Sequence, residues 1–161
     1  MISIKIIALG KLKETYWKQA ESEYIKRLSP YSKLSIIELP EEPFREGSDR
    51  ENIKEKEAKK VLDFLGKNES HISRTIFVLD EHAKQYTSHE FASLLEKNST
   101  RGEEIFFIIG GPLGLHTSLL QKGDKTLSLS LLTFPHQMVR TILLEQIYRA
   151  MTLLQNKTYH Y

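Results

Sequence analysis

The sequence predicts an α/β protein with a mostly parallel sheet of five to six strands, flanked by helices. Short segments rich in isoleucine and phenylalanine recur along the chain, such as ISIKIIAL and EIFFIIGG. Between them lie longer stretches whose apolar residues fall three or four positions apart, the spacing of amphipathic helices. Apolar strands that alternate with such helices are buried on both faces, as in parallel sheets. No repeat, low-complexity segment or linker divides the sequence, so we expect one domain over residues 1–161.

The first half of the chain is predicted to hold two strands and two helices. The strands are expected at residues 2–9 and 34–39, and the helices at residues 13–28 and 52 to about 65. The first helix ends before Pro30, because a residue that precedes proline disfavours the helical conformation. The polar stretch 40–51 is rich in turn formers and is predicted to be a surface loop. The inward-facing residues are expected to be Trp17, Ala20, Tyr24, Leu28, Ile53, Val61, Leu62 and Leu65.

The second half is predicted to hold three strands and three helices. The strands are expected at residues 74–80, 104–111 and 126–131, and the helices from Thr87, at 117–121 and at 136–154. Thr87 and Glu90 have the spacing of a capping box, in which each side chain bonds the other residue's backbone N–H. The buried residues are expected to be Phe91, Leu94, Leu95, Val139, Ile142, Leu143, Ile147, Ala150 and Leu154.

The last helix is apolar on more than one face, with Met138, Leu144 and Met151 beside its core stripe. A helix that is apolar nearly all round must be covered on all sides. We therefore expect a homodimer in which a second copy covers part of this helix.

Composition excludes several classes of protein. The net charge of +2 and the pI of about 8.7 permit an RNA partner without indicating one. The chain has no cysteine, and its six histidines show no metal-binding spacing, so we expect no metal site. No apolar run approaches the roughly 20 residues that span a membrane. The apolar start contains Lys5 and is better interpreted as a strand than as a signal peptide, which predicts a cytoplasmic protein.

Three motifs fall where predicted strands end, which is where parallel α/β proteins hold ligands. They are V-L-D at residues 78–80, I-G-G-P-L-G at 109–114, and S-L-L-T-F-P-H-Q-M-V-R at 130–140. The glycine motif is neither a dinucleotide fingerprint nor a P-loop, and a tight turn without a ligand explains it equally well. A carboxylate such as Asp80 equally often caps a turn.

His136 and Arg140 lie four residues apart and share one face of the last helix. Arg140 could hold a phosphate or stabilise developing negative charge, or it could pair with a nearby carboxylate. Glu145 and Arg149 have the spacing of a structural ion pair. The closing Tyr159, His160 and Tyr161 offer aromatic rings that could stack on bases.

In combination these motifs resemble one family. They are G-K-L-K-E and Y-W-K-Q-A near the start, I-G-G-x-x-G-L, T-F-P-H-Q-M-x-R, and the final Y-H. Together they resemble the small bacterial methyltransferases of the RlmH/YbeA type in the SPOUT superfamily. That resemblance implies transfer of a methyl group from S-adenosylmethionine to ring nitrogen N3 of pseudouridine 1915 in the helix 69 loop of 23S ribosomal RNA. It also implies a C-terminal trefoil knot that binds the cofactor, and a homodimer that acts on the assembled ribosome.

The resemblance also assigns site residues. Catalytic roles fall on Arg140, Tyr159 and His160, with the tail reaching toward the partner's site. Cofactor contacts fall on Leu79, Gly110, Leu129, Ser130, Leu131, Leu132, Thr133 and Phe134.

The chain departs from the family where Leu131 and Tyr161 replace residues that are usually basic. Those two losses leave open a catalytically weak or inactive RNA-binding protein of the same fold. A nucleotide-binding protein of flavodoxin-like type is a second alternative.

Overall fold

The computed structural model describes residues 1–69 and 71–159, and it contains one sheet of five parallel strands in the order β2-β1-β4-β3-β5. The strands are β1 Ile2–Leu9, β2 Ser32–Leu39, β3 Arg74–Leu79, β4 Glu104–Ile109 and β5 Lys125–Leu127. The helices are α1 Thr15–Leu28, α2 Arg50–Lys67, α3 Ser88–Thr100, α4 Thr117–Lys122 and α5 His136–Leu154. The predicted α/β fold with a parallel sheet is confirmed.

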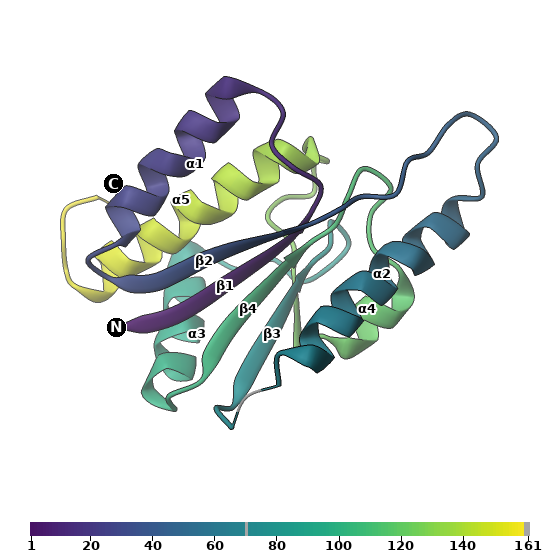
Figure 1. Cartoon of the computed structure of the whole chain (residues 1–161). Helices are drawn as coiled ribbons and strands as arrows, with labels where there is room; N and C mark the ends of the chain where they lie inside the picture. The colour runs from purple at the N-terminus through teal and green to yellow at the C-terminus, as the bar shows by residue number, and fades with distance from the viewer. Residues whose placement is uncertain (70, 160–161) are drawn as a thin grey trace.

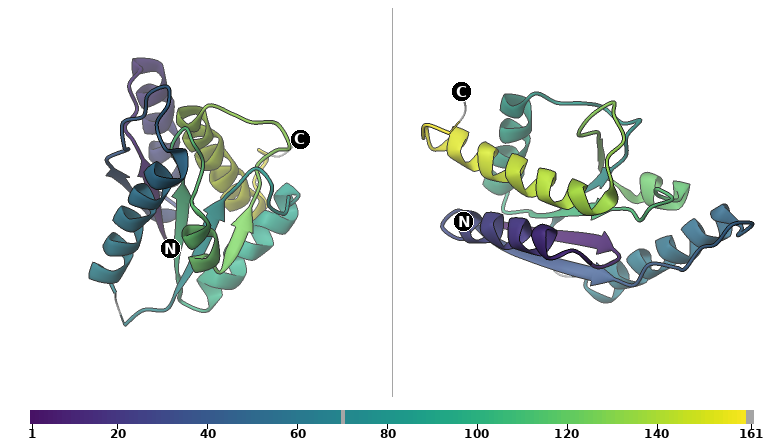
Figure 2. Two further views of the ribbon diagram at one scale, coloured as in Figure 1. Left: turned by 90° about the vertical axis from the view of Figure 1, so that its right-hand side faces the viewer. Right: turned by 90° about the horizontal axis from the view of Figure 1, so that it is seen from above.

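The helices form two layers, one on each face of the sheet. Helices α1, α3 and α5 cover one face, and α2 and α4 cover the other (Figures 1 and 2). Neighbouring residues of the central strands point to opposite faces, so Phe107 packs in the α5 layer while Phe106 packs in the α2 layer. Both phenylalanines are fully buried, which explains why these strands are apolar throughout.

Helix starts follow the expected capping chemistry. Both hydrogen bonds of the predicted capping box between Thr87 and Glu90 are present at the start of α3. The Asp49 carboxylate accepts a 3.1 Å hydrogen bond from the Asn52 N–H at the start of α2. These caps satisfy N–H groups that have no partner within the helix.

The strand predicted at residues 126–131 ends at Leu127, and the next residue, Ser128, forms an isolated parallel bridge with Gln85. The Ser128 hydroxyl donates to the backbone oxygens of Glu81 at 3.1 Å and Ser130 at 2.9 Å, which turns the chain out of the strand direction. Leu131 and Leu132 follow as exposed residues of a loop. A side chain that bonds nearby backbone has competed here with the sheet ladder.

The expectation that Leu144 and Met151 need a partner to cover them is also wrong. Both are buried within the single chain, at 0% and 3% exposure. Helix α5 packs against α1 on one side and α3 on the other, above the sheet, so its own domain covers most of its surface. Met138 alone of the three is only half-buried. The apolar width of α5 therefore reflects its central position in its layer.

Within the described residues, no helix is both long and apolar enough to cross a membrane.

Candidate functional site

A cleft of about 610 Å³ opens where β3, β4 and β5 end and α5 begins. Three stretches of chain line it: residues 79–81, residues 109–115, and the segment from Leu127 to Val139. Clefts of about 300–1,000 Å³ hold small molecules and cofactors. Its position at the carboxyl edge of a parallel sheet is the one that the strand-end motifs predicted.

The glycine motif forms one wall of the cleft as a tight turn. The Gly114 N–H donates to the Gly111 oxygen at 3.1 Å, and Gly114 has a φ of +81°, a conformation that favours glycine. A Cβ added to Gly110 would lie 3.0 Å from Leu115 Cγ and 3.2 Å from the Gly114 carbonyl carbon. The glycine at 110 is thus required by the packing of the turn on itself.

Hydrogen bonds join the loop after β3 to the segment that follows β5. The Asp80 N–H donates to the Leu127 oxygen at 3.0 Å, and the Ser128 N–H donates to the Lys84 oxygen at 2.9 Å. The Thr133 hydroxyl donates to the Glu81 carboxylate at 2.5 Å. Residues 80–85 and 127–133 are far apart in sequence, and these bonds fix both around the cleft.

The predicted cofactor residues gather here, with one exception. Lining the cleft are Leu79, Gly110, Leu129, Ser130, Leu132, Thr133 and Phe134. Leu131 does not line it, and its side chain is 82% exposed. Whether the lining residues contact a cofactor stays a prediction.

Comparison with known families decides the class of protein. A family model described as "Predicted SPOUT methyltransferase" matches residues 2–160. The chain belongs to the SPOUT methyltransferase family. This is the RlmH/YbeA type that the sequence motifs indicated.

Solved structures share the fold at low sequence identity. A probable methylase family protein from Haemophilus influenzae Rd KW20 has a TM-score of 0.55 and 15% identity, over 98% of this chain and 70% of that one. A probable methyltransferase from Bordetella pertussis Tohama I has a TM-score of 0.54 and 12% identity, over 92% and 93%. The SpoU methyltransferase AviRb from Streptomyces viridochromogenes, solved in complex with AdoMet, has a TM-score of 0.50 and 11% identity, over 95% and 58%.

His136 also lines the cleft of this SPOUT methyltransferase, although only its place in a motif had singled it out. Burial lowers the pKa of its imidazole, and the positive charges of Lys13 and Arg140 act in the same direction, against Glu41. The ring is therefore neutral at pH 7 and can accept a proton. Asp80 and Glu81 contribute carboxylates to the same cleft.

Arg140 does not line the cleft. Its guanidinium is 3% exposed and donates to the Glu38 carboxylate at 2.5 Å, the Glu21 carboxylate at 3.2 Å and the Gly10 oxygen at 3.1 Å. Its contacts fit the structural reading of a partner for nearby carboxylates, and they join α5 to the ends of β1 and β2 and to α1. A direct role in catalysis stays a prediction.

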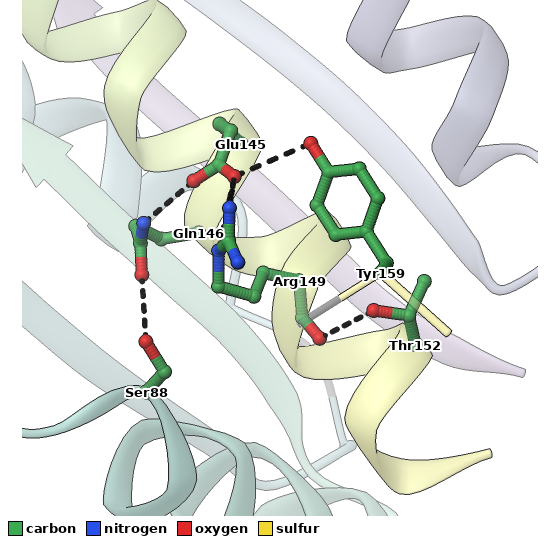
Figure 3. Close-up of polar contacts among 6 residues, drawn as sticks. All are labelled: Ser88, Glu145, Gln146, Arg149, Thr152 and Tyr159. Carbon is green, nitrogen blue, oxygen red and sulfur yellow. Dashed lines mark hydrogen bonds and ion pairs between the residues drawn. The ribbon is translucent and has the colours of Figure 1, made fainter. Parts of the chain in front are cut away.

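Tyr159, the last described residue, packs against α5 of its own chain. The Tyr159 hydroxyl donates to the Glu145 carboxylate at 3.3 Å (Figure 3). The Tyr159 ring also packs edge-on against Tyr148 and lies beneath the Arg149 guanidinium. Burial, with help from hydrogen bonding, raises the pKa of Tyr159 to about 12. The predicted ion pair of Glu145 and Arg149 is confirmed.

Helix α5 starts at the cleft and runs back along the sheet, so its C-terminal end lies away from the cleft (Figure 1). The helix rises about 18 Å between His136 and Tyr148, at 1.5 Å per residue. The predicted His160 lies outside the described residues. Among those that are described, no group of histidine and acidic side chains could hold a metal ion.

Proposed function

We propose that this protein transfers a methyl group from S-adenosylmethionine to ring nitrogen N3 of pseudouridine 1915 in 23S ribosomal RNA, on the assembled large subunit in the cytoplasm. The observation that carries the proposal is a cleft at the carboxyl edge of the sheet, enclosed by two hydrogen-bonded loops, in a chain of the SPOUT methyltransferase family.

The cleft fits S-adenosylmethionine in size and chemistry. Leu79, Leu129, Phe134 and Val139 supply apolar walls for an adenine ring. The glycine turn and residues 129–130 and 132–134 line the cleft, and their backbone peptide groups could fix the orientation of a cofactor there. When bound, the cofactor supplies an electrophilic methyl group on its sulfonium, so the hard chemistry is its own. The AdoMet complex of AviRb, which shares the fold, supports this assignment.

The hydrogen bonds between these two loops support a trefoil knot. Asp80, Glu81 and Lys84 are hydrogen-bonded to the segment that leads from β5 into α5. We take this segment to pass through the loop, so that the bound cofactor contacts both. Such threading is rare among folds, and we propose it here because the chain belongs to the SPOUT family.

The remaining task of the protein is to position the pseudouridine and remove its N3 proton. The reacting nitrogen must approach the methyl carbon to about 3–3.5 Å, in line with the sulfur. Tyr159 and His160 are proposed to contact the base, with His160 as a proton acceptor or hydrogen-bond donor. Arg140 is proposed to act as a positioning residue, because its three contacts hold the first turns of α5 beside the cleft. The neutral His136 on the cleft wall offers a second proton acceptor.

The position of Tyr159 favours a homodimer with shared sites. In the single chain this residue is hydrogen-bonded to Glu145 and packs against Tyr148 in the C-terminal half of α5, whereas the cleft lies at the first turn of that helix. We therefore propose that the tail of a partner subunit completes the site.

Two measurements test the proposal. Calorimetry should show one S-adenosylmethionine site per chain, and the absence of binding would reject the enzyme in favour of the RNA-binding alternative that Leu131 keeps open. Mixing a chain truncated after residue 157 with a Gly110→Val chain should restore activity that neither has alone. A mixed dimer has one site with an intact cleft and an intact tail from the other chain. If no activity returns, the tail does not act across the dimer.

A further inference from the structure

Glu57 is a buried carboxylate that the proposed chemistry does not use. It lies on α2 and is 3% exposed, among the few buried charged residues of the described chain. Glutamate is almost never fully buried without a partner, because removing its charge from water is costly. The position of Glu57 therefore calls for an explanation in terms of its contacts.

The first contact of Glu57 is with the loop that follows β2. The Glu42 N–H donates to Glu57 Oε1 at 2.8 Å. Lys60, one turn further along α2, donates to the Pro40 oxygen at 2.7 Å and pairs with the Glu42 carboxylate at 2.5 Å. These bonds fasten residues 40–42 to α2 and place a fixed support on that side of Glu57.

The second contact is with the glycine turn that walls the cleft. A Cβ built on Gly111 would lie 3.3 Å from Glu57 Oε2 and 3.5 Å from Oε1. The carboxylate therefore occupies the space that a side chain on Gly111 would need. Gly111 is itself the residue whose oxygen closes the turn by accepting from the Gly114 N–H.

We propose that Glu57 is a positioning residue that sets the glycine turn in the conformation that receives the cofactor. The Glu57 side chain accepts a hydrogen bond from the Glu42 N–H and lies beside Gly111. Helix α2 thereby fixes the position of the glycine turn in the cleft wall. The inference rests on the proposed function, since it assigns a role within the same cleft. Glu57 does not line the cleft and has no direct part in methyl transfer.

Burial of the Glu57 carboxylate has a cost in folding stability. Burial raises the pKa of Glu57, against the hydrogen bond from Glu42 and the charge of Lys60, while Glu41 and Glu42 add to the rise. A raised pKa means that the ionised form costs stability near neutral pH, and this cost falls as pH falls toward the unfolded value. Glu57→Gln should accordingly leave folding stability unchanged or raised at pH 7.5.

A double-mutant cycle on Glu57 and Gly111 tests the proposal. Glu57→Ala should weaken S-adenosylmethionine binding by about tenfold, the scale of a lost hydrogen bond to a charged group. Gly111→Ala should weaken it by severalfold in the natural chain, because the new Cβ displaces the carboxylate. In the Glu57→Ala background the same change should cost less than about twofold, because the contact is gone. Additive effects would overturn the proposal.

Two further readouts separate positioning from general damage. In ligand-free protein, amide exchange at Gly114 should rise in Glu57→Ala while exchange in β1 stays unchanged. Glu57→Gln keeps an acceptor for the Glu42 N–H, so this variant should fold normally. It should lose part of the affinity for S-adenosylmethionine, and the affinity that remains should no longer depend on pH in the acid range through this residue. The control is Glu55→Gln, an exposed residue of the same helix, which should match the natural chain. Natural affinity and natural Gly114 exchange in Glu57→Ala would refute the role.

If the natural chain itself fails to bind S-adenosylmethionine, the proposed function falls. The exchange at Gly114 still decides the role of Glu57 in that case.

Discussion

Replacing Arg140 by alanine should destabilise the fold far more than replacing an ordinary surface arginine. The guanidinium is 3% exposed and serves two carboxylates and one backbone oxygen. Its removal leaves Glu21, Glu38 and the Gly10 oxygen without their donor. Breaking a buried ion pair from one side typically costs about 3–5 kcal/mol. The side chains of Glu21 and Glu38 keep 18% and 31% exposure, so water repays part of the loss.

We therefore expect a loss of about 3 kcal/mol in the free energy of unfolding, the lower end of that range. For a chain of this length, that corresponds to a fall in Tm of about 6–12 °C. The variant should still fold, since domains are typically stable by about 5–15 kcal/mol. Arg140→Lys keeps the charge but cannot serve three acceptors in a fixed geometry, so its loss should be about half as large.

Urea unfolding at pH 7.5 measures these differences. Adding Glu38→Gln to Arg140→Ala should recover part of the stability, because it removes one carboxylate that has lost its partner. The penalty should also shrink at pH 5, because burial raises the pKa of Glu21 and this carboxylate loses its Arg140 partner in the variant. An Arg140→Ala chain within about 0.5 kcal/mol of the natural one would refute the network. Lost methyl transfer without lost stability would instead restore a direct catalytic role.

Three further changes probe the cleft and its rim. Gly110→Ala adds a Cβ 3.0 Å from Leu115 Cγ, so it should weaken S-adenosylmethionine binding about tenfold by calorimetry; unchanged affinity would remove the turn from the cofactor site. Leu131→Lys restores a charge at a fully solvated position, and should steepen the salt dependence of RNA binding by about one unit without loss of stability; an unaltered slope would place Leu131 away from RNA. The lowered pKa of His136 means that the unfolded chain binds its proton more readily, so stability should fall as pH drops below about 6.5. His136→Asn should lose that part of the pH dependence, and an identical profile would show that the ring is not buried in solution.

Local signals predicted much of the fold. The capping box of α3 follows from two residues, and the apolar strands follow from composition alone. The length of β5 did not follow, because alternation at residues 127–131 looks like a strand until Ser128 bonds the Glu81 backbone across the chain. Apolar residues on several faces of α5 likewise suggested a partner subunit, because its neighbours in the fold cannot be seen in the sequence. Sequence shows how apolar a helix is, but only tertiary structure shows that α1 and α3 flank it.

The candidate site was predicted in outline. Arg140 was predicted as a site residue or a partner for a nearby carboxylate, whereas Glu57 was missed although the sequence holds a signal for both as buried charges. Glu57 stands four residues from both Ile53 and Val61, on the apolar stripe of a highly charged helix. Arg140 likewise stands three residues before the buried Leu143. A charged residue on an apolar stripe is a buried charge, and a buried charge requires a partner. The identity of that partner depends on contacts between distant segments, which spacing along the sequence does not contain.

The most direct test of the account is mass spectrometry of 23S ribosomal RNA nucleosides from cells with and without this protein. We predict that N3-methylpseudouridine disappears in its absence, that the natural chain restores it, and that a Gly110→Val chain does not. The unmethylated pseudouridine should remain at position 1915. An unchanged level of the methylated nucleoside in cells that lack the protein would contradict the central claim.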